Sequence, residues 1–160
     1  EDKERIQWFA AKYANAHDVF FVGRGIDYAV CLEGSLKLKE ISYINANAYA
    51  AGELKHGPIA LLDENMPVMA VLGPGATLPK MISNCMEAKA RNAPLAAVIS
   101  EKEAAAQELF DYLIKVPQTN ASLFPILANI PLQLLAYYIA DALGREVDQP
   151  RNLAKSVTVE

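Results

Sequence analysis

Four short runs of apolar residues alternate with helical patterns along the chain, and this alternation limits the fold more than any other feature. Each run is continuously apolar, which is typical of strands in a parallel sheet that is covered on both faces. The pattern therefore predicts an α/β fold, a three-layer αβα sandwich with a mainly parallel sheet. The strands are expected at 19–22, 68–72, 96–99 and 112–116, and the helices at about 4–16, 27–44, 77–92, 101–110 and 123–143.

The length and composition fit one folded domain. The chain has 160 residues, of which 52% are hydrophobic and 21% charged, and this excludes a disordered chain. The formal net charge of −4 provides no basic patch of the kind that nucleic-acid binding requires. We expect residues 1–143 to form the domain and residues 144–160, which lack strong periodicity, to form an extended tail over it.

The cysteines and the longest apolar segment indicate the cellular compartment in which the protein is expected. Cys31 and Cys85 lie far apart, without CxxC or metal-ligand spacing, so we expect reduced core thiols in a cytoplasmic protein and no metal site. No secretory signal opens the sequence. The segment 123–143 is long enough to cross a membrane, but polar residues and two prolines interrupt it. It is predicted to be a buried or interface helix, kinked near Pro131.

A charged triad, Glu33, Lys37 and Glu40, lies on one face of the helix expected at 27–44. At about 100° per residue the three side chains project within roughly 60° of one another. Between apolar walls, such a cluster can form a catalytic base of raised pKa. The alternative is two ordinary ion pairs, which stabilise a helix by ~0.2–0.5 kcal/mol each without any further function. Gly34 favours the functional interpretation, because glycine inside a helix costs about 1 kcal/mol and suggests a close approach by another backbone or a ligand.

The loop Gly23-Arg24-Gly25 follows the first predicted strand, at the edge where ligands bind in parallel α/β sheets. Its backbone amides could bind an anion at the start of the next helix, which makes Arg24 and Gly25 candidate substrate-binding residues. The alternative is a simple tight turn, because the third glycine and the acidic residue of a dinucleotide site are missing.

Three segments of the sequence form a recognisable set: 33–43, which contains the triad, 48–58, which contains Gly52-Glu53-Leu54-Lys55-His56-Gly57-Pro58, and 148–160, which begins Asp148-Gln149-Pro150-Arg151. Together they resemble the glucosamine-6-phosphate synthase family, specifically its C-terminal sugar isomerase (SIS) subdomain. The resemblance covers essentially the whole chain. It implies the SIS fold and an enzyme that opens the ring of fructose 6-phosphate, adds glutamine-derived ammonia at C2 and moves a proton from C1 to C2, without a cofactor. The product is glucosamine 6-phosphate.

The resemblance also implies a role for individual residues. Glu40 matches the acid/base of the proton transfer, Lys37 a lysine that assists at the same end of the sugar, and Glu33 a charged site residue. His56 matches the histidine linked to ring opening, and Lys155 the lysine that forms a Schiff base with the open ketose. A histidine titrates near neutrality, and an imine-forming lysine must be neutral part of the time, so both residue types suit these steps.

Without the resemblance, the last two residues have ordinary explanations. His56 precedes Gly57-Pro58 and could be a helix C-terminal cap. Lys155 lies close to the last residue of the sequence, where lysines are usually solvated.

Two parts of the family's complete enzyme are missing from the sequence. Residue 1 is glutamate, where the glutaminase domain has a nucleophilic cysteine, and no Ser/Thr-rich phosphate loop follows a predicted strand. We therefore expect half of an isomerase domain. Its expected partners are sugar phosphates, the glutaminase domain and first SIS subdomain of the same protein, and a second copy in a homodimer. The alternative is a non-catalytic SIS module that senses a sugar phosphate or dimerises, but the combination of Glu40, His56 and Lys155 favours the enzyme.

Overall fold

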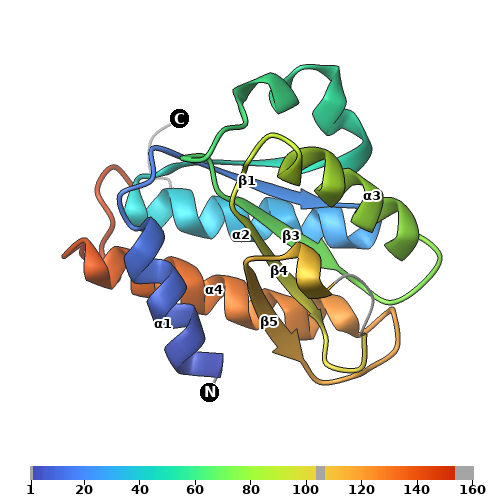
Figure 1. The fold of residues 1–160 in the computed structure, drawn as a ribbon. Helices are drawn as coiled ribbons and strands as arrows, with labels where there is room; N and C mark the ends of the chain where they lie inside the picture. Colours follow the sequence, from blue (N-terminus) through green and yellow to red (C-terminus); the bar gives the residue numbers. More distant parts are fainter. Residues whose placement is uncertain (1, 104–106, 154–160) are drawn as a thin grey trace, which may run out of the picture.

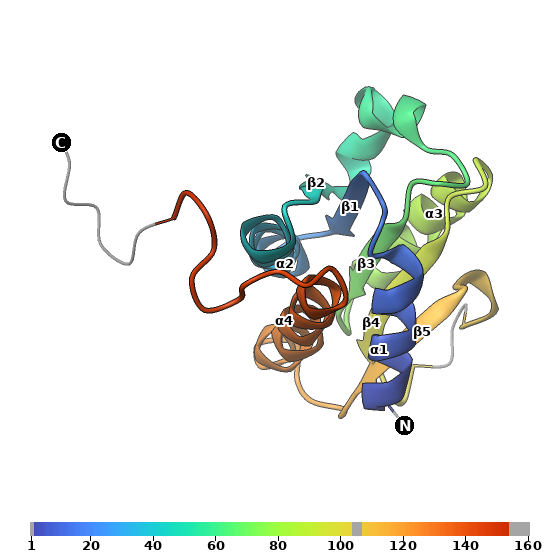
Figure 2. The same ribbon diagram turned by 90° about the vertical axis from the view of Figure 1, so that its left-hand side faces the viewer.

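The computed structural model describes residues 2–103 and 107–153, which form a five-stranded sheet between two layers of helices (Figures 1 and 2). The predicted α/β sandwich is confirmed. In chain order the elements are α1 (Asp2–Tyr13), β1 (Asp18–Gly23), α2 (Ile26–Ser42), β2 (Asn45–Ala50), the 3₁₀ helices η1 (Ala51–His56) and η2 (Pro58–Leu61), β3 (Val68–Leu72), α3 (Leu78–Lys89), β4 (Leu95–Ser100), the 3₁₀ helix η3 (Gln107–Leu109), β5 (Tyr112–Val116) and α4 (Phe124–Ala142).

All neighbouring strands are parallel, in the order β2-β1-β3-β4-β5. Val68 of β3 is in register with Phe20 of β1 on one side and with Leu95 of β4 on the other. Because parallel strands that follow one another need a crossover, α2 returns antiparallel to the strands between β1 and β2. The carboxyl ends of all five strands therefore meet at one edge of the sheet, and the C-terminal end of α2 lies at the opposite edge.

Each face of the sheet has its own apolar cluster, which explains the continuous apolar runs in the sequence. Val19 and Phe21 of β1 belong to the cluster under α1, α2 and α4, while Phe20 and Val22 belong to the cluster under α3, η1 and η2. Figure 2 shows α2 and α4 on one side of the sheet and α3 on the other. Within the first layer α4 packs against both α1 and α2.

Gly34 allows α2 to pack closely in this layer. A Cβ atom on Gly34 would lie 2.8 Å from Cδ1 of Leu132 in α4 and 3.2 Å from Cε1 of Phe21 in β1. The close approach predicted from this glycine is therefore present, but core side chains make it, and not a backbone or a ligand.

The four predicted strands are confirmed, and one further strand, β2, was missed because of its composition. Its residues alternate polar Asn45 and Asn47 with alanine, and its position at the sheet edge leaves it only partly buried, so no continuous apolar run marks it. The helix predicted at 101–110 is wrong. Over the part of that segment that the structure describes, only the short η3 forms, and the apolar residues that pack in the core, Leu109 and Phe110, lie together at its end and not along a helical face.

The helix expected at 123–143 forms as α4 and contains Pro131 in its interior. Among the described residues, no helix is long and apolar enough to cross a membrane. Cys31 and Cys85 are free and buried, as expected of core thiols. Burial raises the pKa of both thiols, that of Cys85 to about 12, so neither is a reactive thiolate near neutral pH.

Candidate functional site

The charged triad of α2 forms a connected set of ion pairs. Nζ of Lys37 lies 2.7 Å from Oε2 of Glu40 and 3.9 Å from Oε1 of Glu33. The hydrogen bond to Glu40 raises the pKa of Lys37, so the ammonium stays charged across the neutral range. The spacing along the helix predicted both pairs correctly.

The expectation that apolar walls bury the triad is wrong for this chain. The side chains of Glu33, Lys37 and Glu40 are 42%, 36% and 27% exposed. The physical reason is the position of α2 in the outer layer, where the sheet and α4 cover only part of its surface. Water and small ligands can therefore reach all three groups.

Two open hollows adjoin the triad, and Glu33 lines both. One hollow, of about 460 Å³, lies between α2 and β2. The other, of about 400 Å³, lies between α2 and α4 and is mostly apolar. The first is lined by Ala29, Leu32, Glu33, Ser35, Leu36, Lys39, Asn47 and Ala48. The second is lined by Ile26, Ala29, Val30, Glu33, Pro125, Ile126 and Asn129.

Tyr43 holds the start of the C-terminal tail beside the triad. Its backbone adopts a left-handed conformation with φ 66° and ends α2 three residues after Glu40. The backbone N–H of Arg151 donates a 3.0 Å hydrogen bond to the hydroxyl of Tyr43, and the Arg151 guanidinium lies 4.1 Å from the ring centroid. The guanidinium of Arg145 lies 5.2 Å from the same ring. Sequence reasoning missed this role of Tyr43.

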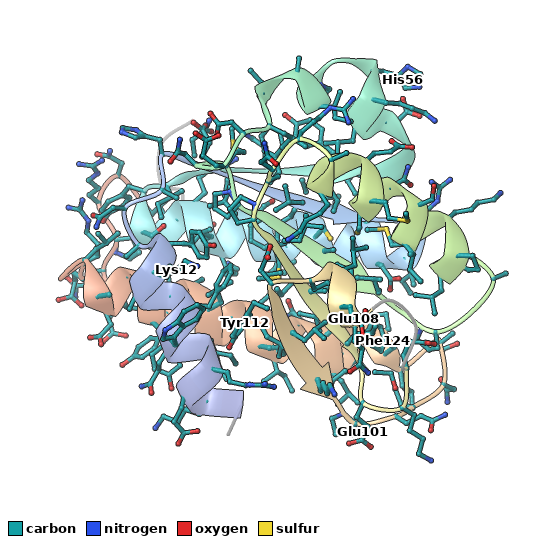
Figure 3. All side chains as sticks on the ribbon, viewed as in Figure 1. Lys12, His56, Glu101, Glu108, Tyr112 and Phe124 are labelled. Carbon is teal, nitrogen blue, oxygen red and sulfur yellow. The ribbon has the colours of Figure 1, made fainter. Side chains whose placement is uncertain are left out.

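His56 is not brought to the triad within the described part of the chain. His56 is exposed at the end of η1, and its side chain projects from the upper tip of the molecule in Figure 3. Glu40 lies near the C-terminal end of α2, at the amino edge of the sheet, so the six residues of β2 separate the two by about 20 Å. Lys155 lies outside the described residues.

The loop after β1 makes contacts inside the protein. Nη1 of Arg24 donates a 2.8 Å hydrogen bond to Oδ1 of Asn84, and Gly25 adopts a left-handed backbone with φ 58°. The buried carboxylate of Asp27 accepts a 2.8 Å hydrogen bond from the backbone N–H of Gly73. Burial raises the pKa of Asp27. Substrate contact at Arg24 and Gly25 stays a prediction, but a carboxylate in the first turn of α2 disfavours a second anion there.

The triad and the tail together favour proton-transfer chemistry on a small polar ligand. A carboxylate that is open to a ligand can accept and return a proton, and an adjacent ammonium can stabilise negative charge that develops on that ligand. The tail enters the same region at Tyr43 and can bring further groups to it.

Both the sequence and the structure of the chain are similar to those of known proteins. Residues 12–140 match the SIS domain family. The glutamine–fructose-6-phosphate aminotransferases (isomerizing) of Synechocystis sp. and Thermosynechococcus vestitus are 56% and 55% identical to the chain over 97% and 100% of its length. The chain spans only about a quarter of those relatives, 25% and 26%. The C-terminal domain of glucosamine-fructose-6-phosphate aminotransferase from Francisella tularensis superposes with a TM-score of 0.86 and 40% identity, over 92% of this chain and 42% of that one.

Proposed function

The chain belongs to the SIS domain family, and on that premise we propose that it is the second isomerase half of a glutamine–fructose-6-phosphate aminotransferase. In the proposed reaction the fructose 6-phosphate ring opens, and the C2 carbonyl condenses with a lysine amine to give a Schiff base and water. Ammonia derived from glutamine then adds to this Schiff base and displaces the lysine amine, which leaves a C2 imine of the sugar. A proton then passes from C1 to C2 to give glucosamine 6-phosphate. Identities of 56% and 55% to relatives of that name support the proposal. Because the chain spans about a quarter of each relative, it supplies catalytic groups and is incomplete by itself.

The hydrogen-bonded pair of Glu40 and Lys37 is the observation that carries the proposal. Transfer of a proton between adjacent carbons needs one base that takes the proton from C1 and returns it to C2, and an accessible carboxylate such as Glu40 can do both. Lys37, 2.7 Å away, supplies a positive charge for the negative charge that develops on the substrate. Glu33, which lines both hollows, binds the sugar from the same face.

Residues 144–160 supply the amine in this proposal, as a tail added to the domain at 1–143. Arg151 is held at Tyr43, three residues after Glu40, and Lys155 follows Arg151 by four positions. An anchored amine attacks a nearby carbonyl in an intramolecular reaction, which favours Schiff base formation at C2.

In this proposal, His56 of a neighbouring copy of the chain catalyses ring opening. Within one chain His56 and Glu40 lie at opposite edges of the sheet, so a complete site needs a second subunit in a homodimer. Exposed apolar side chains on α2 and α4 support such association. The glutaminase domain and a first SIS subdomain, which holds the sugar phosphate, are the other proposed partners.

Two further observations support parts of this proposal. The carboxylate of Asp27 at the start of α2 makes this half a poor site for a phosphate, in agreement with a phosphate anchor in the first SIS subdomain. The free, buried thiols of Cys31 and Cys85 suit a reducing compartment, so we assign the protein to the cytoplasm.

The proposal is tested by substituting Glu40→Gln in the full-length protein. The variant keeps the size and polarity of the side chain but cannot accept a proton, so synthesis of glucosamine 6-phosphate should fall by about 10²-fold or more. Glu64→Gln, on an exposed residue far along the chain, is the matched control and should leave the rate unchanged. Undiminished synthesis by Glu40→Gln would remove Glu40 from the mechanism. A full-length protein that binds fructose 6-phosphate without any turnover would instead favour the sensing module.

A further inference from the structure

The side chain of Arg24 joins three segments at the carboxyl edge of the sheet. Its Nη1 donates a 2.8 Å hydrogen bond to Oδ1 of Asn84, an α3 residue that is only 7% exposed. The same guanidinium lies against Gly52 of η1. A Cβ atom on Gly52 would be 3.1 Å from Nη1, 3.6 Å from Nη2 and 3.7 Å from Cζ of Arg24. One side of the guanidinium therefore covers the backbone of η1, while Asn84 fixes its orientation.

The segment that Arg24 supports is the one that ends in His56. Ala51 and Leu54 anchor one side of η1 in the apolar cluster under α3. His56 is the last residue of η1, and the chain then turns at Gly57 with φ 146°. A six-residue 3₁₀ helix has few internal hydrogen bonds, so its orientation depends on the groups packed against it.

We infer that Arg24 is a positioning residue for His56: it fixes the direction of η1 and so the place where His56 reaches a neighbouring site. The inference rests on the proposed role of His56 in ring opening. Arginine suits the position because a planar guanidinium can cover Gly52 and donate to Asn84 at the same time, which a lysine ammonium cannot. Glycine suits position 52 because any side chain there would displace the guanidinium of Arg24.

A double-mutant cycle in the full-length protein tests the inference. Arg24→Met removes the hydrogen bond and the planar contact, and it should lower the rate of glucosamine 6-phosphate synthesis by about tenfold or more, because a misplaced catalytic group loses efficiency. When His56 has already been replaced in His56→Ala, the added Arg24→Met change should lower the rate less than about twofold, because its effect passes through His56. The limb of the pH–rate profile that disappears in His56→Ala should also weaken in Arg24→Met.

The outcomes separate this inference from the function on which it rests. If His56→Ala keeps the full rate, the proposed role of His56 fails. If His56→Ala lowers the rate but Arg24→Met lowers it by the same factor in both backgrounds, Arg24 acts independently and the inference is overturned. Arg91→Met is the matched control, because Arg91 is exposed just after α3 and its guanidinium donates a hydrogen bond to the backbone carbonyl of Glu87, away from η1. If the Arg24→Met variant fails to fold, the same double-mutant cycle with Asn84→Leu in place of Arg24→Met tests the inference.

Discussion

Asp27 carries a titratable group into the interior where β1, α2 and β3 meet. Its carboxylate accepts a hydrogen bond from the N–H of Gly73, and a Cβ atom on Gly73 would lie only 2.6 Å from its Oδ1. A Cβ atom on Gly23 would lie 2.6 Å from the carbonyl carbon of Asp27. A side chain at position 23 or 73 would collide with Asp27, so both positions require glycine.

The pKa of Asp27 predicts a pH-dependent stability. Burial raises the pKa of Asp27 above its ordinary value, so the folded state holds the proton more tightly than the unfolded state. Its contribution to stability is therefore most favourable at low pH and is lost as the pH rises through the folded-state pKa. Asp27→Asn keeps an acceptor for Gly73 but cannot ionise, so the wild type should lose stability relative to the variant over the range above the ordinary pKa of an aspartate, about 4. Urea unfolding of both proteins across this range measures the difference, and a difference independent of pH would contradict the assignment.

At the level of single residues, sequence reasoning reached only the local part of the site. Lys37 and Glu40 lie one helical turn apart, so their pairing follows from the spacing. Tyr43 and Arg151 are separated by 108 positions, and no local pattern indicates that the two meet. The exposure of the triad also escaped prediction, because it depends on which elements pack beside α2.

Among the elements, the packing of α2 against α4 depends on a single missing side chain. Gly34 faces Leu132 and Phe21 at distances that leave no room for a methyl group. This contact lies within the apolar cluster that also includes Cys31 and Leu38 of α2.

We expect Gly34→Ala to destabilise the domain. Overpacking of a filled core costs about 1–3 kcal/mol, and the better helix propensity of alanine returns about 1 kcal/mol of that. The midpoint of denaturant unfolding should therefore fall. In a Leu132→Ala background the added methyl group has space, so Gly34→Ala should become neutral or stabilising there. A stabilising effect of Gly34→Ala in the otherwise native sequence would refute the packing argument.

The elements that sequence predicted best are those with a strong pattern of their own. β3 and β4 are entirely buried, and all their residues except Ser100 are apolar; both strands were predicted within one residue of their ends. β2 was missed because its identity as a strand comes from pairing with β1, not from its own residues. The segment 101–110 has helix-forming residues, but its core-packing residues, Leu109 and Phe110, lie together at its end, and helix propensity alone is too weak to fix a structure.

On the scale of the whole molecule, α2 and α4 leave an apolar surface open to solvent. We call this surface the α2/α4 face. Its exposed large apolar side chains are Ile26, Leu32, Leu36, Ile126, Ile130, Leu134 and Tyr137.

We expect the isolated chain to self-associate through the α2/α4 face, because exposed apolar groups of this extent usually mark an interface. Ile130→Glu places a charge in the face and should shift the protein towards monomer at concentrations of about tens of micromolar. Met86→Glu, on the exposed surface of α3 in the opposite layer, is the control and should leave the association unchanged. Sedimentation measures both, and a strictly monomeric native chain would count against the prediction.

The contact between the first and last helices has a consequence for how the domain is made. α1 packs against α4, and the two lie side by side in Figures 1 and 2. A ribosome must add about 130 residues between the end of α1 and the end of α4. At roughly 5–20 residues per second, α4 is complete on the order of 10 s after α1 has been synthesised. During translation the apolar side of α1 and the adjoining face of the sheet stay uncovered, so this layer closes only after synthesis of α4, and a nascent chain stalled before that point is a substrate for chaperones.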